Sequence, residues 1–283
     1  MIDYGMDGSV AVIALDRPEK ANAQNAALLR ELNAAMERAA ADDDVRVVVL
    51  RANGRHFSAG HDIAGFFTEE EHALIHGQEG HGTRDHYAFE AEVFVKWTRE
   101  WRDLPKPMIA AVQGACVASG LMLAWACDII IAADDARFGD SVMKLGMGPG
   151  VEYAAHTWEF GVRKAKELLF TGGFIDAAEA HRIGMVNRVV PRDELDSAAM
   201  TLAHEIAQMD PFALRMAKRA VNLTQDMQGY RNSVEAVFDM HMVNHAHTAA
   251  KVGIGTTIDA STGKPLDGVK ALADQNKAAL AKT

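Results

Sequence analysis

The sequence predicts an α/β fold, and three observations lead to this class. Short apolar runs bounded by proline, glycine or aspartate are typical of buried strands. Longer stretches with apolar residues at helical spacing are typical of amphipathic helices. The two kinds alternate over most of the 283 residues and then give way to helices alone. We therefore predict an α/β core over residues 1–195 and a helical module with an atypical tail over residues 196–283.

These patterns place the elements in chain order. Strands are predicted at residues 10–15, 45–51, 108–112, 128–132 and 186–190. Helices are predicted at residues 26–40, 87–104, 119–127, 154–169, 176–183, 191–209, 211–225 and 230–246. Between residues 63 and 86, glycines, glutamates and four histidines replace the periodic pattern. We predict a mobile, polar, lid-like segment there.

Composition and charge exclude several classes of function. The formal net charge of −10 argues against a nucleic-acid surface, because phosphate contacts need clustered Lys and Arg. No apolar run reaches the roughly 20 residues that a membrane-spanning helix needs, and no signal peptide is recognisable before Tyr4. We expect a cytoplasmic protein with neither a membrane nor a nucleic-acid partner. Cys116 and Cys127 lie in one apolar stretch and are predicted to be core residues rather than a disulfide pair.

Residues 108–139 form the unit around which the chain is organised. A buried strand is followed by a turn of small residues from Gly114 to Gly120, then by an apolar helix and a second buried strand. The turn lacks bulky side chains where the helix begins, so a ligand could approach the backbone closely. The N–H groups at a helix N-terminus favour anionic oxygens. We therefore predict a ligand-binding turn at this point.

Several further motifs accompany this unit in a fixed order. They are RPEKANA at 17–23, FSAGHDI at 57–63, the stretch from Pro107 through Gly114 and Gly120 to Ile129, ARFG at 136–139, GMGPG at 146–150 and AKELLFTG at 165–172. This ordered set, over about residues 8–220, resembles the enoyl-CoA hydratase/isomerase (crotonase) family. The resemblance implies a crotonase-like spiral of ββα units with a C-terminal helical trimerisation module. It also implies a homotrimer or a dimer of trimers.

The resemblance further implies an acyl-CoA substrate and an oxyanion hole made of two backbone N–H groups. Matching of the motifs assigns the donors to His61 and Ser119. No separate cofactor is implied, because coenzyme A is part of the substrate. An enolate formed next to a thioester carries its charge on the thioester oxygen, and each preorganised donor there contributes about 3 kcal/mol. Residues expected to contact the substrate are Lys20, Ala21, Ala59, Gly60, Asp62, Ile63, Tyr87, Met122 and Val142.

The two glutamates that serve hydratases of this family as acid and base are missing. Met122 occupies the first position and Val142 the second. Neither side chain can activate water or protonate a carbon atom. The first candidate to replace them is Asp140, which could also be a turn-capping aspartate, and the second is Glu152, which could also be an ordinary acid at a helix start. Residues of the covering segment are further candidates, namely His81, His86, Tyr87 and Glu90.

Two alternatives to a hydratase/isomerase therefore stay open. One is a CoA-thioester hydrolase or C–C lyase of the same fold, and the other is a non-catalytic acyl-CoA-binding oligomer. The pairs His72/His76 and His241/His245 have a spacing that can bind a metal on one helix face. Because no HExxH motif or carboxylate cluster accompanies either pair in the sequence, no metal site is predicted.

Overall fold

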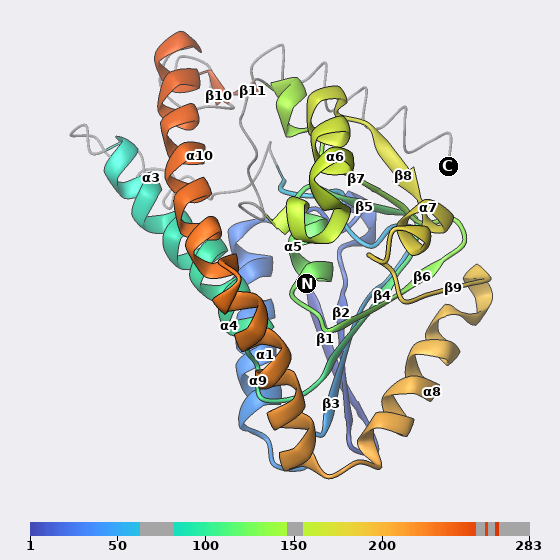
Figure 1. Cartoon of the computed structure of the whole chain (residues 1–283). Coiled ribbons are helices and arrows are strands. Elements are labelled where there is room, and N and C mark those ends of the chain that lie inside the picture. The colour runs from blue at the N-terminus through green and yellow to red at the C-terminus, as the bar shows by residue number, and fades with distance from the viewer. Residues whose placement is uncertain (63–81, 146–154, 253–257, 260–263, 266–283) are drawn as a thin grey trace.

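The computed structural model describes residues 1–62, 82–145, 155–252, 258–259 and 264–265 (Figure 1). The strands are β1 (Ile2–Asp7), β2 (Val10–Leu15), β3 (Val47–Ala52), β4 (Met108–Val112), β5 (Ala115–Val117), β6 (Ile129–Ala133), β7 (Arg137–Gly139), β8 (Phe174–Asp176), β9 (Arg188–Val190), β10 (Ile258–Asp259) and β11 (Lys264–Pro265). The α-helices are α1 (Ala26–Ala41), α3 (Gly82–Glu90), α4 (Trp97–Arg102), α5 (Ser119–Trp125), α6 (Ala155–Thr171), α7 (Ala177–Arg182), α8 (Leu195–Ala207), α9 (Pro211–Met227) and α10 (Tyr230–Val252). Short 3₁₀ turns are η1 (Pro18–Lys20), η3 (Val142–Leu145) and η4 (Arg192–Glu194), and η2 (Ala91–Lys96) is a π-helix.

A six-stranded sheet in the order β1-β2-β3-β4-β6-β9 is the main layer of the fold. Only its edge strand β1 runs antiparallel to its neighbour, and the other pairs are parallel. Side chains alternate between the two faces along each strand. On β4, for example, Met108 and Ala110 belong to one core cluster and Ile109 and Ala111 to the other. Both faces are therefore covered, as is usual for a parallel sheet.

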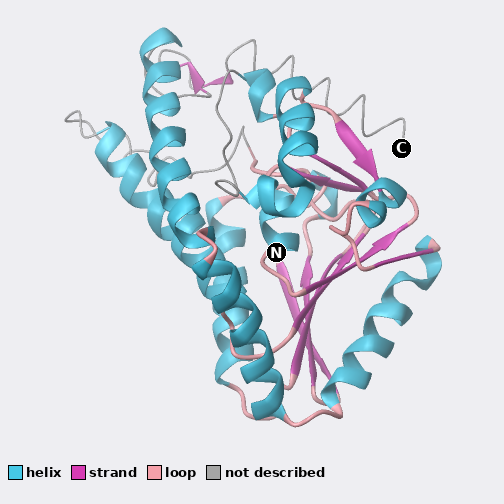
Figure 2. Cartoon of the chain, viewed as in Figure 1, coloured by secondary structure: helices cyan, strands magenta, loops and turns pink. Residues whose placement is uncertain are grey.

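Helices cover the two faces of this sheet in different ways (Figure 2). Helix α8 covers one face with Leu195, Ala199 and Leu202, all buried. The other face packs on α1, α4 and α5 in the larger core cluster. The predicted domain boundary at residue 195 thus falls at the start of a helix that packs on the core sheet.

A second, three-stranded sheet carries the predicted ligand-binding turn. Its order is β5-β7-β8, with β5 parallel to β7 and β8 antiparallel to β7. The register pairs Val117 with Gly139 at the ends of β5 and β7. The chain leaves β5 at Val117 and enters α5 at Ser119, so the turn lies at the edge of this small sheet.

The C-terminal helices extend the molecule along the opposite side from α8 (Figure 1). Helix α10 packs against α3, η2 and α9. Helix α9 buries none of its residues in the single chain. No helix in the described part of the chain is both long enough and apolar enough to cross a membrane.

The structure confirms most predicted elements and corrects others. The strand at 108–112 has the predicted bounds, and the Asp176 side chain caps α7 by accepting the Glu179 N–H. Strands β1, β5, β7 and β8 were not predicted from the sequence. The last three have only three residues each, too few to show a period of two. β1 is an exposed edge strand that contains Gly5 and two aspartates, residues that are depleted in strands.

The predicted helix at 87–104 begins earlier, at Gly82, and continues through η2 into α4. Residues 82–86, predicted to belong to the lid-like segment, are therefore helical. The rest of that segment, residues 63–81, lies outside the described residues, as does the tail after residue 265. Cys116 and Cys127 are not joined by a disulfide bond.

Candidate active site

The turn at residues 57–61 is held between two neighbouring segments. On one side, the Gln24 N–H donates to the Gly60 carbonyl and the Asp62 N–H donates to the Gln24 carbonyl, both at 2.8 Å. On the other side, Ser58 forms a parallel bridge with Cys116 of β5. The bonds of Gln24 to Gly60 and Asp62 make a parallel bridge between Gln24 and His61. In such a bridge, the N–H of the residue between the two bonded neighbours, here His61, points away from the partner strand. The His61 N–H therefore points away from Gln24.

The second turn, Ala118–Ser119–Gly120, packs directly against the first. A β-carbon placed on Gly60 (φ +92°) would lie 3.0 Å from the Val117 carbonyl oxygen and 3.7 Å from the Ser119 nitrogen. A β-carbon on Gly120 would lie 2.8 Å from the Ser58 carbonyl oxygen. The contact at Gly120 is closer than β-carbons come in practice, and at Gly60 the tight contact is combined with a positive φ that favours glycine. The small residues are thus needed to bring the two backbones together.

The turn before α5 has an unusual backbone conformation. Ala118 has φ 48° and ψ −117°, which is a strained region for a residue with a β-carbon. Its N–H donates to the Gly139 carbonyl at 3.0 Å, so the end of β7 holds it in place. Ser119 begins α5, and the first N–H groups of a helix have no acceptor within the helix. The Ser119 N–H and the His61 N–H therefore belong to two turns in contact.

The His61 imidazole lies in the interior next to the first turn. It stacks on Phe94 of η2 with ring centroids 4.5 Å apart. Burial lowers the pKa of His61 to about 4, although the charges of Glu90 and Asp140 oppose this shift. The ring is therefore neutral at pH 7.

The other residues predicted around the substrate occupy different environments. The Ala21 carbonyl accepts the Ala59 N–H at 2.9 Å, which joins the loop after η1 to the first turn. Lys20 is exposed beside it. The Asp62 carboxylate forms an ion pair with Arg17 at 2.7 Å, so its charge anchors the loop.

Tyr87 donates from its hydroxyl to Asp239 of α10 at 2.9 Å and thereby joins α3 to α10. Ile63 and Glu152 lie outside the described residues.

Met122 lies one helical turn after Ser119 and is almost fully buried. Its side chain lines a pocket between α4, α5 and α10. The lining is mostly apolar, but it also contains charged side chains, namely Arg99, Arg102, Arg231 and Glu235. Val142 begins η3 and is half-buried. Neither Met122 nor Val142 has a side chain that can transfer a proton.

Asp140 is fully buried and lies immediately after Gly139, whose carbonyl holds the second turn. One carboxylate oxygen accepts the Val142 N–H at 3.0 Å, and the other lies 2.9 Å from Nε2 of His156. The His156 ring is buried and meets Trp125 edge to face. Asp140 therefore caps the turn with one carboxylate oxygen and forms a buried carboxylate–imidazole pair with His156 through the other.

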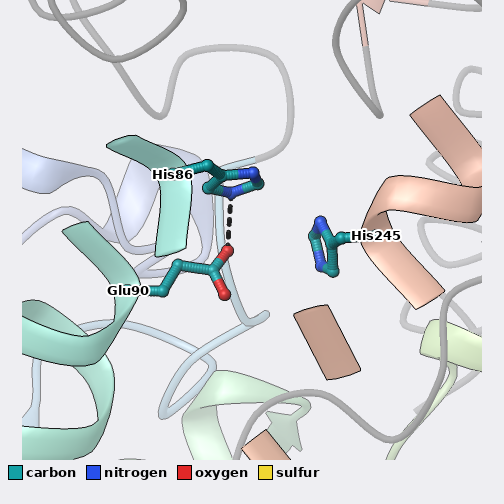
Figure 3. A group of neighbouring side chains, drawn as sticks. All are labelled: His86, Glu90 and His245. Carbon is teal, nitrogen blue, oxygen red and sulfur yellow. Dashed lines mark ion pairs between the residues drawn. The ribbon is translucent and has the colours of Figure 1, made fainter. Parts of the chain in front are cut away.

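A second buried carboxylate–histidine group lies where α3 meets α10. The Glu90 oxygens lie 2.7 Å from Nε2 of His86 and 3.1 Å from Nε2 of His241 (Figure 3 shows His86, Glu90 and His245). Burial favours the neutral acid, but the hydrogen bonds from His241 and His86 outweigh it and hold the pKa of Glu90 well below its ordinary value. His245 stacks edge to face on His241, with ring centroids 4.1 Å apart.

Some of these polar residues could not be assigned to a site from the sequence. His156 lies in a helical pattern and has no distinguishing neighbour. His86 and Glu90 were only candidates on a covering segment, and His241 and His245 were a histidine pair without a carboxylate. The one sequence signal was a four-residue spacing that His86/Glu90 and His241/His245 share, although the two pairs are about 150 residues apart. Only the packing of α3 against α10 brings the pairs together.

The fold and the two opposed turns define a protein of the crotonase class, and comparisons with known proteins agree. The profile described as Enoyl-CoA hydratase/isomerase matches residues 5–258. EchA13 of Mycobacterium tuberculosis, a relative named as an enoyl-CoA hydratase, is 44% identical over 270 residues, covering 88% of this chain and 83% of that one. The chain belongs to the enoyl-CoA hydratase/isomerase family.

Solved structures show the same relationship. The crystal structure of a probable enoyl-CoA hydratase from Mycobacterium thermoresistibile is 52% identical, with a TM-score of 0.80 over 88% of this chain and 98% of that one. An enoyl-CoA hydratase/isomerase from Xanthobacter autotrophicus Py2 is 32% identical, with a TM-score of 0.80 over 98% of this chain and 97% of that one. The crotonase fold predicted from the motifs is thereby confirmed.

Proposed function

We propose that this protein binds an acyl-CoA thioester and stabilises its enolate with the His61 and Ser119 N–H groups. The observation that carries the proposal is the contact between the two turns, which leaves room for neither a Gly60 nor a Gly120 side chain. Two preorganised donors next to a developing oxyanion stabilise it by about 3 kcal/mol each. Backbone donors suit this task because no side-chain motion is needed to form them.

The apolar pocket at Met122 supports binding of the acyl group. Met122, one of its lining residues, lies one helical turn after Ser119 on α5. In this proposal, a thioester oxygen held at the two turns directs its acyl chain toward the pocket. The apolar residues that line it include Phe94, Met122, Trp125, Ala126, Ala155 and Val234. A glutamate in place of Met122 would put a carboxyl group into this lining. An apolar acyl group is therefore the favoured occupant.

Asp140 with His156 is the best-supported replacement for the missing glutamates. It follows the residue that holds the second turn, and its charge is close enough to oppose in part the burial that lowers the pKa of His61. A carboxylate hydrogen-bonded to an imidazole can accept a proton while the imidazole shares the charge. In this proposal the pair removes and returns the proton on the α-carbon next to the thioester carbonyl.

The decisive experiment measures enolate formation without assuming the final product. Incubation of the protein with butyryl-CoA in D₂O should introduce deuterium at the α-carbon, as detected by NMR. Ser119→Pro removes the Ser119 N–H donor, and proline is tolerated at the first position of a helix. Deuterium exchange at the α-carbon should then fall about 100-fold. Exchange at the wild-type rate in a folded Ser119→Pro protein would refute the oxyanion assignment.

The same samples separate the alternative reactions. Hydration of crotonyl-CoA is expected to be slow, since neither Met122 nor Val142 can activate water, and rapid hydration would refute this reasoning. Release of free CoA would favour the hydrolase alternative. Binding of butyryl-CoA without exchange, hydration or CoA release would favour the non-catalytic alternative.

The exposed side of α9 supports the proposed homotrimer or dimer of trimers. Phe212, Leu223 and Met227 are 69%, 53% and 81% exposed, and helical geometry places them on one side. Such an apolar surface is typical of an interface. Leu223→Asp should reduce the mass measured by light scattering to that of one chain. Val162→Asp on α6, which is similarly exposed at 55%, is the control and should leave the mass unchanged.

A further inference from the structure

The polar group at the contact of α3 and α10 is outside the proposed enolate chemistry. Each helix contributes two residues spaced four apart, His86 with Glu90 and His241 with His245. Residues at this spacing lie on the same side of a helix. Because α3 packs against α10, the two pairs meet: Nε2 of His241 lies 3.1 Å from Glu90, and Figure 3 shows His245 beside His86 and Glu90.

Three of these side chains bring their ligand atoms together. One nitrogen each of His86 and His245 and one Glu90 oxygen all lie within 4.8 Å of one another. The His86 and Glu90 atoms are already 2.7 Å apart. Ligands of one tetrahedral zinc ion, each about 2.0–2.1 Å from the metal, lie a little over 3 Å apart. Small side-chain rotations would therefore place all three around a common centre.

We propose that His86, Glu90 and His245 bind a divalent transition-metal ion, with Zn²⁺ as the best match to two imidazoles and one carboxylate. This ligand set is the one found in catalytic zinc sites with three protein ligands and an open fourth position. Hard ions such as Mg²⁺ and Ca²⁺ prefer all-oxygen sites and are disfavoured here. His241, hydrogen-bonded to the second Glu90 oxygen, would orient the carboxylate.

His245 provides a separate indication of a ligand. Its side chain is buried, yet its Nδ1 has no hydrogen-bond partner among the described residues. A buried polar atom without a partner is costly, and a site that binds an ion or water is a common explanation. His86 remains 15% exposed, which gives an ion a route from solvent.

The local backbone also points to a specialised site. Glu90 is the last residue of α3, and the π-helix η2 starts at the next position. Such π-turns within helices are frequent at functional sites. Through Phe94, η2 also contacts the His61 ring. A metal held at Glu90 would thus lie close to the first oxyanion turn, although the proposal does not depend on the enolate chemistry.

The test uses the full-length protein after removal of metals with EDTA. Titration with Zn²⁺ in a calorimeter should show one ion per chain with a submicromolar Kd. Co²⁺ should give the intense visible absorption of a tetrahedral site. Glu90→Gln and His245→Gln should each weaken Zn²⁺ binding by at least 100-fold, while circular dichroism verifies folding.

His247→Gln is the matched control, since His247 is an exposed histidine on the same helix. It should bind Zn²⁺ like the unmodified protein. Absence of stoichiometric Zn²⁺ binding to the unmodified protein would overturn the proposal. Equal affinity in the Glu90→Gln, His245→Gln and control variants would also overturn it, because the ion would then bind at another place.

Discussion

The candidate site combines two kinds of functional group, backbone N–H groups in one part and polar side chains in the other. The proposed oxyanion side consists of backbone, with the turn at 57–61 against the turn at 118–120, and small residues such as Gly60 and Gly120 lie where the two turns meet. The other part consists of side chains, with Asp140 and His156 in the proposed acid/base group and Glu90 with three histidines in the separate group between α3 and α10. The first side needs a backbone shape, whereas the second needs particular functional groups.

In the proposed function, this difference would allow the oxyanion chemistry to be retained while the acid and base change. A backbone donor is unaffected by replacement of a neighbouring side chain, as long as the turn keeps its shape. Replacement of a glutamate by methionine, in contrast, removes the group that transfers the proton. The following predictions test whether the two sides are separable in this way.

Asp140→Asn should have the largest effect, a loss of about 1000-fold in deuterium exchange at the α-carbon of butyryl-CoA. The amide keeps the shape of the carboxylate but cannot accept the proton. The Kd for butyryl-CoA, measured by calorimetry, should stay within a few-fold of the original. Asp196→Asn, at an exposed ion pair with Arg51, is the control and should leave exchange unchanged. If Asp140→Asn exchanges deuterium normally, Asp140 is not the base.

Met122→Glu should lower the free energy of unfolding by about 3 kcal/mol, because it buries a carboxyl group in an apolar lining. Met122→Leu keeps the volume and should cost less than about 1.5 kcal/mol. Urea denaturation measures both. Equal stability of the two variants would show that an arginine of the lining, Arg99, Arg102 or Arg231, compensates the added carboxyl group.

Gly120→Ala should reduce exchange about 100-fold, or about 2.7 kcal/mol of transition-state stabilisation. The added β-carbon meets the Ser58 carbonyl oxygen at 2.8 Å and must move one of the two turns. Gly5→Ala is the control, since its β-carbon meets nothing within 4 Å. Retained exchange in a folded Gly120→Ala protein would mean that the contact between the turns is not required.

Acidification from pH 6.5 to pH 5 should destabilise the protein by about 2 kcal/mol for each of His61 and His245. Burial lowers the folded-state pKa values to about 4 and about 3, below the ordinary value of 6.5. Between these values the unfolded chain binds more protons, so the free energy of unfolding falls as the pH falls. Urea denaturation at both pH values measures the loss. His245→Gln should show a smaller loss, and an equal loss would contradict the assignment.

Prediction from sequence succeeded where the signal is local. The strand Met108–Val112 and the capped start of α7 at Asp176 were recovered, because a buried strand and a capping side chain depend on nearby residues. The small residues Gly60 and Gly120 also stand out in the sequence, and the structure shows the close contacts that require them. The three-residue strands β5, β7 and β8 escaped prediction because they are too short to show a period of two.

The sequence by itself determined the α/β class, the crotonase resemblance, the two small-residue turns and the absence of glutamates at Met122 and Val142. Only the folded chain brings His156 to Asp140, and α10 to α3 so that His245 meets Glu90. The physical reason is distance along the chain. Helix and strand periods, caps and turns depend on neighbours within a few residues. A contact between side chains about 150 residues apart depends on how every intervening element packs.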